Sequence, residues 1–270
     1  TMRIDTDASH IFGVGFTSDG ERLAYMSWRY QTSSDSQTIL TGDARLVDLA
    51  APDQVVEIGY GREAFYTYTL TSDRIVAYDS SDGRLVYWDI DQPDERHNLI
   101  PIYVPSISNL TISPDGSRLA GFSPGNPSRI LLYDLISGKG IDFPVVTDMT
   151  PETLAFRPDG SRLAMGGIDI GTRRALSIWD IARQTEQFRH TFADGIGVTS
   201  IVFSPDGSLV AVGGNALALL DAADGTPLYE SVTGAIMLDQ IRFSSDGRFI
   251  VGGGWDGFVR VWGAPPEDAP

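Results

Sequence analysis

The chain contains no cysteine and is poor in basic residues. Without cysteine it can form neither disulfides nor thiolate metal sites, while the compartment stays open between periplasm, exterior and a slightly preferred cytoplasm. Its 20 Lys and Arg residues stand against 36 Asp and Glu residues, so the net charge at pH 7 is -16. Because phosphate recognition needs clustered Lys and Arg, this balance argues against nucleic-acid partners and anionic membranes.

Long apolar runs are also missing. No segment approaches the roughly 20 residues that a transmembrane helix needs, and no signal-peptide pattern is seen, so we expect no membrane insertion. Met2 stands second, behind Thr1. We therefore expect a segment of a longer protein, with any targeting signal or fused domain lying outside it.

The sequence does contain a repeated unit, and its clearest copy is Gly197–Asp221, GVTSIVFSPDGSLVAVGGNALALLD. The β-branched and aromatic residues before Ser204 are typical of a buried strand. Ser-Pro-Asp-Gly at 204–207 then predicts a tight hairpin turn, because Pro presets φ and Gly accepts a left-handed conformation. Two further strands, at 208–214 and 216–222, complete an antiparallel meander that needs similar neighbours to bury both faces.

The turn motif occurs six times, with start-to-start spacings of 40 to 54 residues. A mean period of about 45 residues is typical of four-stranded propeller blades. Each turn is followed by a third strand that ends in an apolar–Asp pair or its relic, Trp262-Gly263 in the last copy. The six turns are Thr17–Gly20, Thr71–Asp73, Ser113–Gly116, Arg157–Gly160, Ser204–Gly207 and Ser244–Gly247.

An outer fourth strand is predicted in five of the six repeats, at 54–60, 97–104, 139–146, 186–193 and 227–233. The sixth repeat instead ends in a proline-rich tail that cannot sustain a sheet ladder. Thr1–Thr6 alternates apolar and polar residues and could supply the missing strand beside Phe258–Ala264. We thus predict an all-β fold: a single domain, 1–270, forming a six-bladed β-propeller of four-stranded antiparallel blades closed by its N-terminal strand. The repeats are 11–60, 64–104, 107–146, 151–193, 197–233, and 238–264 together with 1–6.

Several stretches resemble the WD-repeat β-propeller family, in its bacterial type: FSPDGSLVAVGG at 203–214, SIWD at 177–180, LVYWD at 85–89 and WDGFVRVW at 255–262. The resemblance implies a rigid platform that gathers protein or peptide partners, usually without catalysis. The His that such blades often carry before the inner strand is absent here. We therefore expect apolar packing to dominate between blades, with Trp88, Trp179 and Trp262 buried. Most such rings have seven blades, and the spare N-terminal strand favours six.

Degenerate copies such as 119–134 are similar instead to Tol-type and prolyl-peptidase propellers. That resemblance implies an alternative function, in which the ring gates or positions a catalytic domain outside this chain.

Candidate catalytic residues are few. Gly121–Gly125 has the form of a G-x-S-x-G nucleophile elbow around Ser123, but Pro124 lacks the backbone N–H that an oxyanion hole needs. The three histidines, His10, His97 and His190, fall in different repeats. Because a triad or zinc site needs convergent groups, we predict no catalytic residue, no cofactor and no metal.

Two other patterns have ordinary interpretations. The D-x-D pairs at Asp5 and Asp7 and at Asp89 and Asp91 lack the twelve-residue loop of a Ca²⁺ site, so they are predicted to be turn carboxylates. Asn109 begins a glycosylation sequon within a predicted inner strand, where a glycan would not fit.

The predicted partner surface is the end of the blades that carries the loops between second and third strands and the loops entering each inner strand. Trp, Tyr and Arg are enriched at interaction hot spots, and Arg on an acidic protein suggests a carboxylate-rich protein or peptide partner. In the alternative interpretation, the Trp residues pack against neighbouring blades and the Arg residues pair with local Asp. We expect a monomeric ring. The first such loop, Ser27–Asp43, is unusually long, and the candidate residues are Trp28, Arg29, Tyr30, Tyr60, Arg62, Arg129, Arg173, Arg174 and Trp255.

Overall fold

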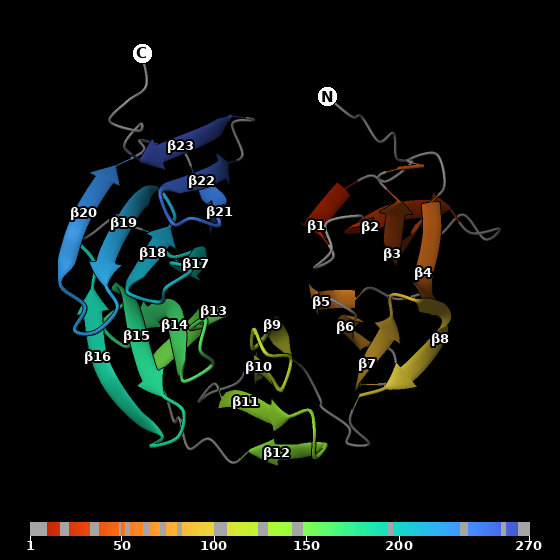
Figure 1. Ribbon diagram of the computed structural model, residues 1–270, viewed down its shortest axis with the longest axis horizontal. Helices are drawn as coiled ribbons and strands as arrows, with labels where there is room; N and C mark the ends of the chain where they lie inside the picture. Colours follow the sequence, from red (N-terminus) through yellow and green to blue (C-terminus); the bar gives the residue numbers. More distant parts are fainter. Residues whose placement is uncertain are drawn as a thin grey trace. The chain divides into compact units, whose positions relative to one another are not determined.

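The computed structural model describes residues 10–16, 22–32, 38–48, 50–51, 55–61, 65–70, 74–79, 83–99, 107–123, 129–141, 148–193, 197–232, 237–254 and 258–263. Regular structure in these ranges is all β, and they contain no helix that could cross a membrane. The chain forms two compact units, 1–112 with 134–139 and 113–133 with 140–270. Figure 1 labels the strands of both units.

The first sheet has the order β1-β2-β3-β4 and is antiparallel throughout. Its strands are β1 (His10–Phe16), β2 (Arg22–Thr32), β3 (Thr38–Asp48) and β4 (Val55–Gly61). The predicted loop Ser27–Asp43 is wrong, because β2 and β3 pair from Arg22↔Asp48 out to Thr32↔Thr38. Aromatic and β-branched residues fill both arms of this stretch, and such residues favour strands over loops.

The second sheet has the order β5-β6-β7-β8. Its outer strand, predicted at 97–104, begins earlier, because Asp89 pairs with Gln92 across a two-residue turn. Pro93 lies within this strand, and an edge strand tolerates proline. The strands are β5 (Phe65–Leu70), β6 (Arg74–Asp79), β7 (Arg84–Asp89) and β8 (Gln92–Asn98).

The third and fourth sheets have the same antiparallel arrangement, with orders β12-β11-β10-β9 and β13-β14-β15-β16. The strands of the third are β9 (Ser108–Ile112), β10 (Arg118–Ser123), β11 (Arg129–Asp134) and β12 (Lys139–Ile141). Those of the fourth are β13 (Met149–Phe156), β14 (Arg162–Asp169), β15 (Arg174–Asp180) and β16 (Thr185–Thr191).

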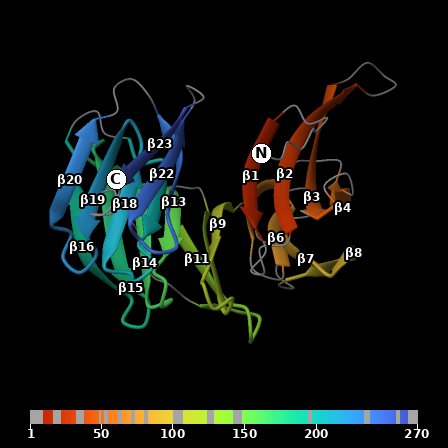
Figure 2. The same ribbon diagram turned by 45° about the horizontal axis from the view of Figure 1, so that its top comes forward.

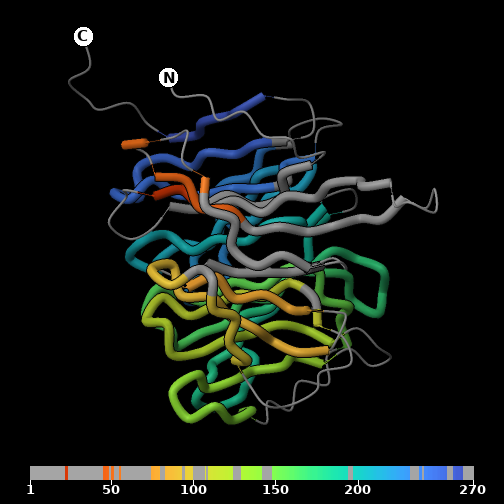
Figure 3. Tube along the Cα trace, turned by 90° about the vertical axis from the view of Figure 1, so that its right-hand side faces the viewer, coloured from red at the N-terminus to blue at the C-terminus, as the bar shows by residue number. Residues whose placement is uncertain are grey.

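The fifth sheet has four described strands, and the sixth has three. The fifth comprises β17 (Ser200–Phe203), β18 (Leu209–Gly213), β19 (Ala216–Asp221) and β20 (Pro227–Val232). The sixth comprises β21 (Leu238–Phe243), β22 (Phe249–Gly254) and β23 (Val259–Gly263). Within the second unit the strands run side by side with turns at both ends (Figure 3). The predicted closing strand, 1–6, lies outside the described residues, so six blades and ring closure remain predictions.

The repeated turn is held by its aspartate, as Ser204–Leu209 shows. The hydroxyl of Ser204 and the N–H of Ser208 donate to Asp206 Oδ1 at 2.5 and 3.0 Å, and the N–H of Leu209 donates to Ser204 Oγ at 2.9 Å. Gly207 adopts a φ of 70° and donates its N–H to Ser204 O at 2.8 Å. The Ser204 hydroxyl and the Ser208 N–H hold the pKa of Asp206 at about 2.

Arginine side chains connect successive turns of the second unit. Arg118 Nη1 donates to the carbonyl of Gly160 at 3.1 Å, and Arg157 Nε donates to the carbonyl of Gly207 at 3.0 Å. Each bond joins the turn of one repeat to the turn of the next. These polar links accompany the apolar packing that the sequence predicts between repeats.

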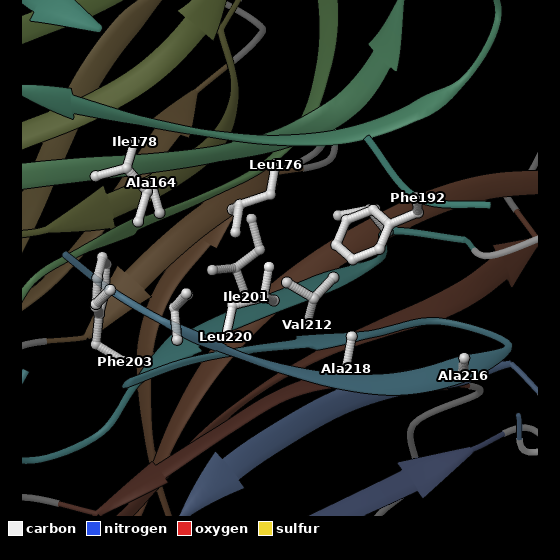
Figure 4. Close-up of a cluster of buried hydrophobic side chains, with 13 residues drawn as sticks. Ala164, Leu176, Ile178, Phe192, Ile201, Phe203, Val212, Ala216, Ala218 and Leu220 are labelled. Atoms are coloured by element: carbon white, nitrogen blue, oxygen red, sulfur yellow. The ribbon is translucent and has the colours of Figure 1, made fainter. Parts of the chain in front are cut away.

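The largest described core fills the space between the fourth and fifth sheets. Leu176 and Ile178 of β15 point toward Ile201, Val212 and neighbouring residues of the fifth sheet (Figure 4). All of these side chains are buried. The apolar alternation of each strand thus places two packed sheets face to face.

The three predicted core tryptophans differ in burial. Trp88 is buried as predicted, with 3% of its surface exposed. Trp179 and Trp262 are half-buried, and each packs against the edge of a core cluster. The prediction of burial was wrong for these two, because each lies near the outer side of its sheet, where a large ring remains partly exposed.

Candidate interaction surface

The predicted partner surface is an end of the sheets, and its best-described part is the turn from β14 to β15. In an antiparallel meander, the turn between second and third strands lies opposite the Ser-Asp-Gly turns. Asp169–Arg174 forms this turn in the fourth sheet and contains two of the predicted residues, Arg173 and Arg174.

Asp169 organises the turn. Its carboxylate accepts the backbone N–H of Arg173 at 2.8 Å and the guanidinium Nε of the same residue at 3.2 Å. The backbone closes through Asp169 N–H to Arg173 O at 2.8 Å and Thr172 N–H to Asp169 O at 2.9 Å. The bond from the Arg173 N–H lowers the pKa of Asp169 below its ordinary value. The turn is therefore a fixed element rather than a loose loop.

Ile170 stands at the tip of this turn with 83% of its surface exposed. Its backbone is nevertheless held, because its N–H donates to the carbonyl of Asp148 at 2.9 Å. Thr172, two residues on, adopts a left-handed φ of 63° that completes the bend. An apolar side chain presented to solvent from an ordered turn is a suitable anchor for a partner's pocket, since little conformational freedom is lost on binding.

The charges around Ile170 are compensated locally. Arg174 forms an ion pair with Glu152, and Arg189 contacts Asp148 at 2.6 Å and Glu186 at 2.7 Å. Partial burial lowers the pKa of Arg189, but the two carboxylates more than offset it, so the net shift is upward. This surface is therefore apolar at its tip and electrically balanced at its base.

The remaining predicted residues fall into two groups. Arg129 is exposed at the start of β11. In the first sheet, β2 contains Trp28, Arg29 and Tyr30, and β4 contains Tyr60. Trp28 pairs with Gly42 of β3, and Tyr60 pairs with the next residue, Asp43. These four predicted residues therefore lie at one end of that sheet. Two positions, Arg62 and Trp255, lie outside the described residues.

The sequence analysis did not identify Ile170 at the tip of the β14–β15 turn, nor the residues around it that form hydrogen bonds and ion pairs. Ile170 was overlooked because the search was for Trp, Tyr and Arg, although an apolar residue inside Asp-Ile-Gly-Thr could have marked it. Asp148 and Glu152 were overlooked because their roles depend on contacts 22 and 41 residues away, with Ile170, Arg174 and Arg189.

The residues considered for chemistry have structural partners. His97 stacks on Tyr87 with ring centroids 4.9 Å apart, and His190 meets Phe192 edge-on at 4.8 Å. Burial lowers the pKa of His190. The described part of the chain holds no group of three or more His, Asp or Glu side chains placed to bind a metal ion.

The two aspartates of one D-x-D pair are also engaged. Asp89 contacts Arg74 at 2.9 Å, and Asp91 contacts Arg22 at 2.6 Å. Asn109 lies in β9 as predicted. Asp5, Asp7 and Pro124 lie outside the described residues.

Comparison with known proteins gives matches of three kinds. The model of the family "WD domain, G-beta repeat" matches residues 185–226 and 233–263. Dipeptidyl-peptidase 5 of Aspergillus fumigatus is 31% identical over 113 residues, which cover 39% of this chain and 16% of the peptidase. The small ribosomal subunit protein RACK1 of Brassica napus is 25% identical over 157 residues, which cover 58% of this chain and 39% of RACK1.

The fold also matches a solved structure, described as the crystal structure of the mitotic checkpoint complex, with a TM-score of 0.75. The alignment covers 96% of this chain and 76% of the matched chain at 17% identity, so it supports the fold alone. Repeated four-stranded antiparallel sheets of this kind define a β-propeller class of protein. Within that class, residues 185–226 and 233–263 are similar to the repeats of the WD-repeat family. The relatives named here come from a fungus and a plant, and they lend no support to the predicted bacterial type.

Proposed function

We propose that the chain is a non-catalytic interaction module of a larger protein, which binds a protein or peptide partner at the end of the sheets that carries the β14–β15 turn. WD-repeat propellers generally mediate protein interactions, and the relatives are longer than the segments matched here. The observation that carries the proposal is Ile170, an exposed apolar side chain on a turn fixed by Asp169 and Asp148.

The proposed partner inserts an apolar pocket over Ile170 and places carboxylates near the guanidinium of Arg173. Arg173 is bound to Asp169, but its side chain is still 59% exposed. An incoming carboxylate could share that guanidinium, which offers five donors. A six-bladed ring closed by residues 1–6 beside 258–264 belongs to the same proposal, because a closed ring would hold such turns at one mouth.

Affinity capture with the full chain as bait tests the surface. We expect Ile170→Asp and Arg173→Ala to lose bound partners that the wild type retains, whereas Trp28→Ala tests the corresponding end of the first sheet. Ile136→Asp is the matched control, since Ile136 is 85% exposed in the β11–β12 turn, outside the proposed surface. If the folded Ile170→Asp and Arg173→Ala variants keep every partner, the proposed surface is wrong.

A second function is favoured by the match to dipeptidyl-peptidase 5. In this alternative, the chain is a propeller that gates or positions a catalytic domain elsewhere in the same protein. Peptidase assays on the full-length protein and on the isolated chain distinguish the two proposals. Activity that resides in the full-length protein and changes with Ile170→Asp supports the enzyme-associated role. A full-length protein without a catalytic domain excludes it.

A further inference from the structure

The β2–β3 hairpin extends beyond the other strands of its own sheet. Each arm is 11 residues long, and the two arms pair along their whole length. β1 pairs with β2 only as far as Trp28, and β4 pairs with β3 only as far as Gly42. Among the described strands, Arg29–Thr32 and Thr38–Thr41 therefore pair only with each other. We call these two segments the ribbon tip, and Figure 2 shows them at the far end of the hairpin.

The outer edge of β3 at Thr38–Thr41 has no partner among the described strands. Only residues 62–64 separate β4 from β5, which begins another sheet. Among the described strands, β4 is the one that pairs with this edge of β3, and its pairing stops at Gly42↔Gly61. The backbone of this edge is thus available to another strand.

The sequence of this edge favours pairing and lacks protection against it. Thr38-Ile39-Leu40-Thr41 contains no charge and no proline, the two features that usually guard a free strand edge. The hairpin from Ser27 to Gly42 carries one Arg and one Asp, so it is locally neutral on a strongly acidic chain. Strand addition at such an edge gains main-chain hydrogen bonds without opposing local charge.

The same four residues are also self-complementary. Read in either direction, the edge is Thr, apolar, apolar, Thr. Antiparallel pairing with a second copy places Thr38 opposite Thr41 and Ile39 opposite Leu40, and the two-fold axis repeats both pairs. Thr–Thr and aliphatic cross-strand pairs are favourable ones. A two-fold axis requires this kind of pattern, because each copy presents the same surface to the other.

We propose that two copies of the chain associate through the β3 edges of their ribbon tips and form one antiparallel four-stranded ribbon. This replaces the monomer expected from the sequence, and it does not rest on the proposed partner surface. The contact is small, so the dissociation constant is expected at or above about 1 µM. Because both copies are acidic, added salt strengthens the association by screening charges beyond about 8 Å at physiological ionic strength.

Sedimentation velocity on the full chain, from low micromolar to near-millimolar concentration, tests the proposal. The wild type should shift from monomer to dimer, and Ile39→Lys and Leu40→Glu should each raise the dissociation constant at least about tenfold. An equimolar mixture of the two variants should recover association, because the proposed register places the introduced Lys opposite the introduced Glu. Gln31→Lys is the matched control, since it adds the same charge to the ribbon tip on β2 and should leave the dimer intact.

Unchanged melting temperatures should accompany these variants, because the ribbon tip lies beyond β1 and β4. A wild type that stays monomeric at the highest concentration overturns the proposal and leaves the β3 edge to a strand of another protein. The proposed pairing is also overturned if Ile39→Lys and Leu40→Glu each dimerise as well as the wild type. It is likewise overturned if the mixture of the two variants associates no more tightly than either variant alone. Neither result bears on Ile170 and Arg173, which are tested by partner capture.

Discussion

At the scale of single residues, the turn aspartates contribute stability through their ionised form. Asp206 accepts bonds from Ser204 and Ser208, and these bonds hold its pKa near 2 against an ordinary value of 3.8. Asp115 has the same partners, Ser113 and Ser117, and the same pKa of about 2. A carboxylate with a depressed folded-state pKa stabilises the fold above its unfolded pKa and loses that contribution as pH falls.

The first prediction concerns this pH dependence. Asp206→Asn removes the ionised acceptor, so the variant should melt at a lower temperature than the wild type at pH 7. The difference between them should shrink as pH falls from about 4 to about 2, the interval between the unfolded and folded pKa values. Melting curves across that interval measure it. Glu230→Gln, on β20 and outside any turn, is the control, and a pH-independent gap would contradict the prediction.

The β19–β20 turn requires glycine at position 225 for two reasons, its backbone conformation and the lack of space for a side chain. Gly225 adopts a φ of 79°, and a Cβ there would lie 2.5 Å from Cδ2 of Phe188 in the preceding sheet. Gly138 occupies the equivalent turn of the third sheet with a φ of 67°, and a Cβ there would meet nothing within 4 Å. At both positions an L-residue would be strained by the left-handed backbone. Only at position 225 would its Cβ also collide with another side chain, that of Phe188.

The second prediction uses this pair. Gly138→Ala should cost about 1–2 kcal/mol, because an L-residue is forced into the left-handed region. Gly225→Ala should cost more, because Phe188 must also move away from the core beneath it. Urea denaturation of both variants gives the comparison. Equal losses of unfolding free energy in the two variants would show that the contact with Phe188 does not contribute to the cost.

At the scale of elements, the sequence located strands well where turn chemistry bounds them. The third strand of the clearest repeat, predicted at 216–222, is β19 at Ala216–Asp221, since Asn215 and Asp221 mark both ends. The length of the β2–β3 hairpin was missed because Ser27–Asp43 was interpreted as one long loop, although the strands pair out to Thr32↔Thr38. β8 begins at Gln92 rather than at the predicted residue 97, because the chain turns back directly after Asp89.

The position of the β14–β15 turn was predictable, but the side chains exposed on it were not. Antiparallel order alone places turns between second and third strands at one end of a sheet, and Arg173 and Arg174 lie at that end of the fourth sheet. Which side chain there is exposed depends on contacts distant in sequence, such as the 22-residue separation of Arg174 and Glu152. No local pattern reports such contacts.

The third prediction tests the packing of the fourth sheet against the fifth. Ile178 is fully buried between them, so Ile178→Ala should destabilise the chain by about 2–5 kcal/mol through lost burial and a cavity. Ile170→Ala removes the same atoms from an exposed turn and should change stability by less than about 0.5 kcal/mol. Chemical denaturation monitored by tryptophan fluorescence compares the two. A similar loss at both sites would mean that Ile170 is not free of packing.

At the scale of the whole molecule, the described strands form six sheets, one in each predicted repeat, and the last of these has three described strands. β23 carries Val259 and Val261 with 72% and 62% of their surfaces exposed. It is the edge strand of its sheet among the described strands, and an apolar strand edge left open is a site of aggregation. A fourth strand would remove this liability, and the alternating segment Thr1–Thr6 remains our predicted source.

The fourth prediction follows from that closure. Deleting residues 1–7 should destabilise the chain by several kcal/mol, on the order of 25 cal/mol for each Å² of apolar surface uncovered on β23 and in residues 1–6. It should also promote aggregation, because the β23 edge would be open. Thermal melting and light scattering measure the two effects. Replacing Met2 and Ile4 with Ser in the intact chain is the control for side-chain burial, since it keeps the backbone of the strand. A deletion variant that melts at the wild-type temperature would show that residues 1–6 do not complete the sixth sheet.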